Sequence, residues 1–210
     1  KVDEATPVHP LTPYGVSKIR SETDISAMAD DSFSPIFLRN GTVYGVSPRL
    51  RVDIVLNNLV GWAYTTGMVK LYTDGTPWRP LIHVEDVSSA FLAALEAPLE
   101  VIHNQVFHVG SNKENYQIIQ VAEIVRSVVP GSCIEFDSEH QGDPRTYIAD
   151  FSKIEEMLPQ FSPVWDAEAG ARQLYAAYRQ ADLTLEEFTS SRYIRLKQIG
   201  DLMQSGRLDN

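Results

Sequence analysis

Apolar residues recur at helical spacing along several stretches of the chain. The clearest stretch covers 116–129, where one face is formed by Ile118, Val121, Ala122, Val125 and Val128. Similar spacing, bounded by Pro, Gly or a polar residue, predicts further helices. Their ranges are 13–31, 53–66, 85–96, 151–158, 166–182 and 190–205.

Short apolar runs separate these helices and predict strands. The runs lie at 36–38, 69–72, 81–84, 105–109 and 133–136. The runs at 36–38 and 105–109 are typical of parallel strands buried on both faces. Residues 39–51 form a polar stretch with Gly and Pro and are expected to be a loop. Alternating strands and helices predict an α/β protein with parallel pairing.

Composition narrows the class of partner. The chain has 210 residues, of which 43% are hydrophobic and 22% charged, as in ordinary globular proteins. Its formal net charge of −10 disfavours a nucleic-acid partner, which requires a basic face. Small anionic ligands remain compatible with this charge, because they need only one or two local cations.

Cysteine and histidine give no sign of a metal centre. Cys133 is the one cysteine, so an internal disulfide and a thiolate cluster are excluded, and we interpret it as a buried structural thiol. The five histidines lack ligand spacing. No apolar run reaches the ~18 residues of a membrane helix, and we expect a cytoplasmic protein without membrane contact.

A Tyr-x-x-x-Lys pair lies at the start of the first predicted helix. Tyr14 and Lys18 are four residues apart, so both side chains can point into one pocket. A free phenol has a pKa near ~10, and a neighbouring ammonium stabilises the phenolate and lowers that pKa. The pair therefore suits proton transfer, although the same spacing also occurs in solvated surface pairs.

The segment around this pair carries a family resemblance. Residues 10–22, PLTPYGVSKIRSE, resemble the active-site helix of the extended short-chain dehydrogenases/reductases, the NDP-sugar epimerase and dehydratase family, which reads P-x-x-PYG-x-SK. The resemblance implies a nucleotide-sugar substrate and NAD as cofactor, with NADP left open. It gives Tyr14 the role of acid/base toward a substrate hydroxyl and Lys18 that of nicotinamide-ribose ligand, so both also bind the cofactor.

Two further motifs extend the resemblance toward the substrate. Residues 38–45, LRNGTVYG, are similar to R-x-x-N-V-Y-G of the family. This alignment places Thr42 at the Asn that touches the nucleotide diphosphate and Asn40 near the nicotinamide. Asn58 and Leu59 match an Asn-Leu pair that contacts the substrate phosphates and sugar. Exposed Asn pairs are otherwise capping or turn residues.

The segment 74–87, DGTPWRPLIHVEDV, resembles D-G-x-x-x-R-D-F-I-x-V-x-D-V. The family's Arg grips the diphosphate, for which a guanidinium fork is suited, and this implies that Arg79 is a substrate contact. Pro80 replaces the usual Asp. Lys70 and Tyr72 fall where the family packs the nucleotide base.

A last motif follows in the segment that includes QGDPR at 141–145 and ADFSK at 149–153. It resembles R-x-G-D followed by A-D-x-S-K. The resemblance implies that Asp143 accepts hydrogen bonds from the nucleotide ribose. His140 stands at the family's Arg position, and Arg145 is the candidate replacement. These departures leave the nucleotide and the sugar open.

No G-x-G-x-x-G or G-x-x-G-x-x-G turn occurs in the chain, although a dinucleotide-binding half requires one. We therefore expect the C-terminal part of a family member: the end of a Rossmann-like doubly wound parallel sheet and a smaller α/β substrate-binding lobe. The expected division gives 1–50 to the Rossmann-like domain and 51–189 to the lobe. The last Rossmann helix and strand, 85–110, are interleaved with the lobe, and 190–210 forms a helical tail.

The sequence leaves function open in two respects. Epimerase and dehydratase are not distinguished, and a non-catalytic member of the fold that binds a dinucleotide or a partner protein is the alternative. Retention of Tyr14, Lys18 and Arg79 favours the enzyme, although the 210 residues alone are expected to be inactive. The resemblance also implies a homodimer through the 13–31 helix, with Ile25 and Met28 on its outer face, together with Ala29.

Overall fold

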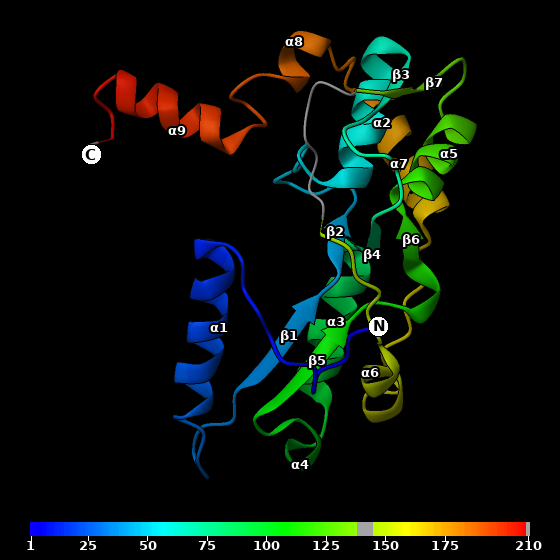
Figure 1. Cartoon of the computed structure of the whole chain (residues 1–210). Coiled ribbons are helices and arrows are strands. Elements are labelled where there is room, and N and C mark those ends of the chain that lie inside the picture. The colour runs from blue at the N-terminus through cyan, green and yellow to red at the C-terminus, as the bar shows by residue number, and fades with distance from the viewer. Residues whose placement is uncertain (138–144, 209–210) are drawn as a thin grey trace.

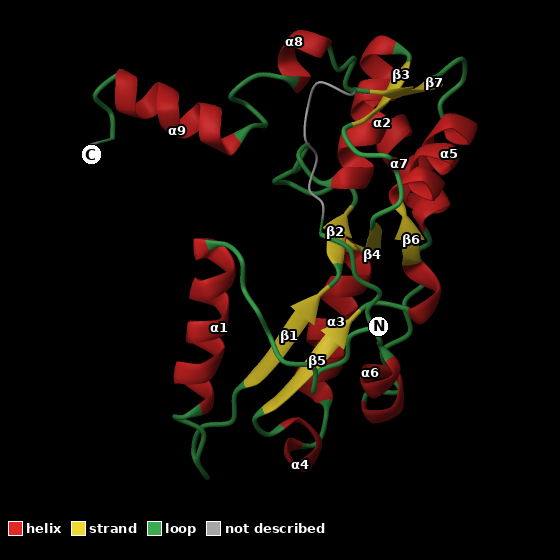
Figure 2. Ribbon diagram, viewed as in Figure 1, coloured by secondary structure: helices red, strands yellow, loops and turns green. Residues whose placement is uncertain are grey.

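A computed structural model describes residues 1–137 and 145–208 of the chain. Helices alternate with strands, and the α/β prediction is confirmed (Figures 1 and 2). The helices are α1 (Pro13–Ser26), α2 (Val55–Thr66), α3 (Val84–Glu96), α4 (Leu99–Ile102), α5 (Ile118–Val128), α6 (Ser152–Met157), α7 (Ala167–Gln180), α8 (Leu185–Phe188) and α9 (Arg195–Gln204), with a 3₁₀ turn at Asn112–Glu114. The strands are β1 (Ile36–Asn40), β2 (Thr42–Tyr44), β3 (Met68–Leu71), β4 (Trp78–His83), β5 (Gln105–Val109), β6 (Asn115–Gln117) and β7 (Cys133–Phe136).

The described strands pair mostly in parallel. β1 runs alongside β5 from Ile36, opposite Gln105, to Asn40, opposite Val109. β2 pairs in parallel with β4, and β3 with β7, whereas β6 joins β4 in the antiparallel sense. The 36–38 run was predicted to be buried on both faces, which is wrong for the described residues. It is half-buried, because β5 is the only described strand bonded to β1.

Two hydrophobic cores hold the elements together. One core lies among α2, α5, α7 and β3 and contains Leu56, Val60, Val125 and Leu174, all fully buried. The other packs α3 and α6 against β5, and Phe107 lies at its centre with no exposed surface. The chain crosses from the first core to the second and back, and its division into domains stays a prediction.

Several predicted boundaries are wrong. The 13–31 helix ends at Ser26, because the Asp30 side chain accepts bonds from the backbone N–H groups of Ser32 and Phe33 and forms a turn. Met28 and Ala29 therefore lie beyond the helix. The predicted loop at 39–51 contains β2, and the 116–129 helix begins at Ile118, because Asn115–Gln117 pairs with β4.

The exposure of Cys133 and the length of the last helix also differ from expectation. Cys133 is exposed rather than buried, because it opens β7, which among the described strands pairs only with β3. The predicted 190–205 helix is shortened to α9, which reaches away from the two cores (Figure 1). α9 has no buried residue, and Leu196 is 82% exposed. Within the described ranges, no helix is long and apolar enough to cross a membrane.

Candidate active site

The start of α1 is fixed by its cap. Thr12 accepts a hydrogen bond from the Gly15 N–H at 3.1 Å, and Pro13 is the first helical residue. The next residue, Tyr14, is 71% exposed, and Lys18 Nζ lies 5.4 Å from the centre of its ring. The two side chains therefore approach each other on one helix face.

Tyr14 and Lys18 open into a cavity of about 640 Å³ between α1, β1 and α3, which we call the α1–β1 cavity. Asn40, at the end of β1, also lines it. The structure thus brings together the three residues that the resemblance assigns to catalysis and cofactor binding. Glu22 and Arg39 form part of the same wall.

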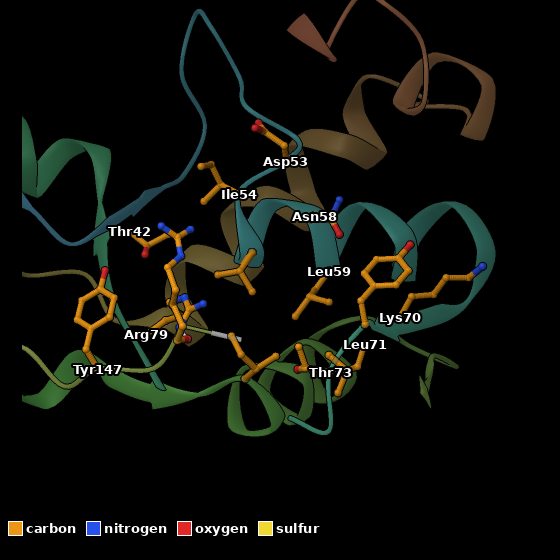
Figure 3. A pocket seen from close by; sticks show the side chains of 14 residues that line it. Thr42, Asp53, Ile54, Asn58, Leu59, Lys70, Leu71, Thr73, Arg79 and Tyr147 are labelled. Carbon is orange, nitrogen blue, oxygen red and sulfur yellow. The ribbon is translucent and has the colours of Figure 1, made fainter. Parts of the chain in front are cut away.

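A second cavity, of about 400 Å³, lies between α2, β3 and β4 and is called the α2–β4 cavity (Figure 3). Every described residue that the resemblance assigns to the substrate lines it. These residues are Thr42, Asn58, Leu59, Lys70, Tyr72, Arg79 and Arg145. Asp143 and His140 lie outside the described residues.

Arg79 occupies one end of this cavity, near Thr42 and Tyr147, and Lys70 lies at the other end (Figure 3). Nη1 of Arg79 donates to the carbonyl of Trp78 at 2.8 Å and to that of Arg145. Its guanidinium carbon lies 5.9 Å from the Tyr147 ring centre. These contacts orient the fork without the Asp that Pro80 replaces.

The contacts of the adjacent Asn57 and Asn58 are compatible with both interpretations made from the sequence, namely a capping or turn role and a contact with the substrate. The Asn58 amide donates to the carbonyl of Val52 at 2.8 Å, and the buried Asn57 accepts from the Gly45 N–H at 3.0 Å. The pair therefore fixes the loop before α2. Asn58 and the buried Leu59 also face the cavity.

At the other end of the α2–β4 cavity, Lys70 Nζ lies 4.8 Å from the centre of the Trp62 ring. Burial, followed by the charge of Asp137, raises the pKa of Tyr72, so its phenol stays protonated at neutral pH. This end of the cavity thus combines a cation with a neutral aromatic hydroxyl.

The segment Asn40–Gly41–Thr42 borders both large cavities. Asn40 lines the α1–β1 cavity and Thr42 lines the α2–β4 cavity. Their Cα atoms are at most about 7 Å apart, because two residues span no more. A smaller cavity of about 170 Å³ touches both Asn40 and Tyr147.

Sequence reasoning missed Tyr147 and the pair Arg51–Asp53. The Arg51 fork bonds the Asp53 carboxylate at 2.7 and 2.6 Å, and Asp53 lines the α2–β4 cavity. Hydrogen bonds from Arg51, and then the charges of Arg51 and Arg195, lower the pKa of Asp53. The available signals were the Arg-x-Asp spacing and the position of Tyr147 just before the ADFSK motif.

The parallel pairing of strands that alternate with helices defines a Rossmann-like α/β protein. Residues 1–110 match the NAD dependent epimerase/dehydratase family, and the chain belongs to this family.

Relatives agree with this membership. The chain is 28% identical over 205 residues to the UDP-glucose 4-epimerase of Streptococcus mutans, covering 84% of this chain and 59% of the relative. It is 28% identical over 184 residues to a dTDP-glucose 4,6-dehydratase of an Actinoplanes species, covering 84% and 54%. The chain spans about half the length of the curated relatives it matches.

A solved structure supports the fold directly. The UDP-glucuronic acid 4-epimerase of Bacillus cereus, in complex with UDP-glucuronic acid and NAD, superposes with a TM-score of 0.73 at 27% identity. The superposition covers 86% of this chain and 56% of that protein.

Proposed function

We propose that this chain supplies the proton-transfer and substrate-binding part of an NAD-dependent nucleotide-sugar epimerase or dehydratase. The observation that carries the proposal is the segment Asn40–Gly41–Thr42, which borders both a cavity holding a Tyr-Lys pair and one lined by Arg79 and Arg145. Such an arrangement suits two anionic ligands that must react with each other. The relative from Bacillus cereus holds UDP-glucuronic acid and NAD together.

The side chains of the α1–β1 cavity fit the nicotinamide end of NAD. Tyr14 and Lys18 offer a hydroxyl and an ammonium to a ribose, and Asn40 offers an amide. The 210 residues contain no Gly-rich turn, so we assign only this end of the cofactor to them. When bound, NAD supplies the redox chemistry.

Tyr14 takes the proton of a sugar hydroxyl and later returns it. A carbinol carbon is oxidised readily only if its hydroxyl proton also leaves, so a base must lie beside it. The Lys18 ammonium lies beside the Tyr14 ring and places a positive charge where negative charge develops as the proton moves.

Arg79 and Arg145 hold the diphosphate, with Thr42, Asn58 and Leu59 along the sugar and phosphates. Lys70 and Tyr72 hold the base, and Asp143 the ribose. The polar groups and cations of the described cavity suit a nucleotide diphosphate better than an apolar ligand. Relatives of both kinds leave epimerase and dehydratase as the two candidate reactions.

The remaining proposals are coarser. The core around β5 belongs to the Rossmann-like domain, and the core around α2 to the substrate lobe. A homodimer forms through α1 and the turn after it, where Ile25 and Met28 are exposed. The cytoplasmic location rests on the use of one cysteine in the whole chain.

The test is Tyr14→Phe in the complete gene product, assayed with UDP-glucose, UDP-glucuronic acid and dTDP-glucose. Turnover should fall by about 10²- to 10⁴-fold, because the proton acceptor is lost while the ring is kept. Thermal stability should change little, since the Tyr14 side chain is mostly exposed. Wild-type-like turnover contradicts the assignment. Binding of both ligands without turnover in the wild type favours the non-catalytic alternative.

A further inference from the structure

Helix α1 is attached to the described part of the molecule mainly by polar contacts. None of its residues is buried. Two side-chain pairs join it to the sheet in the described ranges: Glu22 with Arg39 of β1, and Ser26 with Asn104 before β5. The Ser26 hydroxyl donates to the Asn104 amide oxygen at 2.9 Å. The placement of Tyr14 therefore depends on few contacts.

The Glu22 carboxylate is the acidic group nearest in sequence to Lys18 on this helix face. The two residues are four apart, a spacing at which Lys and Glu pair on helices. Glu22 instead meets Arg39, whose Nε donates to Oε2 at 3.0 Å and whose Nη2 donates to Oε1 at 2.5 Å. The side chains of Arg39 and Glu22 are only 25% and 21% exposed, so the pair is partly shielded from solvent.

A guanidinium fork bonds both carboxylate oxygens in one plane, whereas an ammonium acts as a point charge. Arg39 therefore outcompetes Lys18 for Glu22. Consistent with this, Lys18 Nζ lies over the Tyr14 ring.

We infer that Arg39 is a positioning residue that keeps Glu22 away from Lys18 and so leaves the Lys18 ammonium available to Tyr14. Its catalytic consequence rests on the function proposed above. Whether Glu22 pairs with Lys18 does not depend on the proposed function, and this pairing can be measured separately.

Other charges near Tyr14 must be considered. Lys18, Glu22 and Arg39 are the charged residues lining the α1–β1 cavity in the described ranges. Arg51, in the loop before α2, donates hydrogen bonds to the Asp53 carboxylate, and these bonds, followed by the charges of Asp53 and Tyr14, raise the pKa of Arg51. Because Asp53 holds Arg51, removal of Arg39 leaves Glu22 as the new unpaired charge beside Lys18.

The first experiment measures Lys18 directly in the complete gene product. Its acylation by an amine-reactive ester at about pH 8 is followed by peptide mass spectrometry, since only the neutral amine reacts. In Arg39→Ala, Glu22 should capture Lys18 and slow its labelling by about 1.5- to 2-fold, the strength of a helix i,i+4 pair. In Arg39→Ala with Glu22→Gln, the rate should return to that of the wild type. Glu22→Gln alone should not slow labelling, because no carboxylate is left to capture Lys18.

Unchanged labelling in Arg39→Ala overturns the inference. The Ser26–Asn104 pair remains in every variant, and circular dichroism checks the fold. If Arg39→Ala does not fold, Arg39→Lys replaces it. A lysine ammonium holds Glu22 less completely than a guanidinium fork. An intermediate slowing of Lys18 labelling therefore supports the inference, and the absence of any slowing overturns it.

The second experiment is the pH dependence of turnover in the same variants. A captured Lys18 supports the Tyr14 phenolate less, so the rise of kcat with pH should move to higher pH in Arg39→Ala and return in the double variant. Loss of packing alone lowers kcat at every pH without moving the profile, and that result overturns the catalytic role. Slowed labelling with no turnover in the wild type supports the screening of Lys18 and counts against the proposed function.

Discussion

The Arg79 side chain is anchored by local contacts and faces the α2–β4 cavity. Its guanidinium is held by the carbonyls of Trp78 and Arg145 and lies over Tyr147. A fork oriented in this way needs little reordering when a diphosphate arrives. Arg79→Ala should weaken nucleotide-sugar binding by about 1.5–3 kcal/mol, the range for hydrogen bonds to charged groups. Binding of NAD should be spared, because Arg79 does not line the α1–β1 cavity.

Calorimetric titration of each ligand into the complete gene product checks this. Arg126→Ala is the matched control, since Arg126 pairs with Glu123 on the exposed side of α5 and lines neither cavity. Equal losses for both ligands, or no loss for either, would show that Arg79 is not a selective substrate contact.

Glu114 offers a prediction about pH and stability. Its carboxylate accepts from the Ala167 N–H at 3.0 Å and from the Tyr116 hydroxyl at 3.1 Å, and burial raises its pKa. The folded state then binds the proton more tightly than the unfolded state, so stability falls as pH rises from the unfolded to the folded pKa. In Glu114→Gln this side chain no longer titrates, so the variant does not lose stability in this way as pH rises.

The free energy of unfolding of Glu114→Gln, relative to that of the wild type, should therefore increase as pH rises above the ordinary pKa of a glutamate. Urea titrations at several pH values measure it. Glu123→Gln, at an exposed ion pair, is the control and should show no such increase. A difference that stays flat or falls with pH would contradict the assignment of a costly buried charge.

At the residue scale, the sequence could predict groups whose geometry is local. Tyr14 and Lys18 share a face because of helix periodicity, and Arg79 was identified from a motif around one turn. Tyr147 and Asp53 could not be predicted in the same way. They reach the α2–β4 cavity only because segments distant in sequence fold together around it.

The same distinction holds for whole elements. The helices α2, α3, α5 and α7 were predicted within a few residues, because each has an apolar face that follows the helical period. β2 and β6 have three residues each and were missed. Both pair with β4, and such pairing is not encoded in a short run. β4 itself contains Pro80, which sequence reasoning placed before the strand.

A helix-scale prediction concerns the contact between α2 and α8. A Cβ placed on Gly61 would lie 2.2 Å from a ring carbon of the buried Phe188, which also packs edge-on against Trp62. Helix propensity alone favours Ala by about 1 kcal/mol. Overpacking costs about 1–3 kcal/mol and should win, so Gly61→Ala should destabilise the protein.

Gly200→Ala in α9 is the matched control, because nothing lies within 4 Å of its added Cβ. It should be neutral or stabilising. Thermal unfolding of both variants decides the comparison. A stabilised Gly61→Ala would mean that Phe188 moves aside at little cost and that α8 is loosely held.

At the scale of the whole molecule, the two cavities differ in how completely this chain builds them. The α2–β4 cavity is lined by residues of α2, β2, β3 and β4 together with Arg145 and Tyr147. The α1–β1 cavity is bordered by exposed apolar side chains, such as Leu95 at 80% exposure, and β1 is bonded to one described strand. This difference between the two cavities was expected from the sequence, because it contains no Gly-rich turn.

The asymmetry predicts different ligand binding by a polypeptide of these 210 residues alone. It should bind UDP-glucose or another nucleotide sugar detectably, because the described residues that are proposed to bind this ligand all line the α2–β4 cavity. It should not bind NAD tightly, because the phosphates of a dinucleotide need a Gly-rich turn at a helix N-terminus. Titration of both ligands into the purified polypeptide tests the difference, with Arg79→Ala as the variant that should lose the nucleotide sugar. Tight NAD binding by the polypeptide would refute the argument, since its sequence contains no Gly-rich turn.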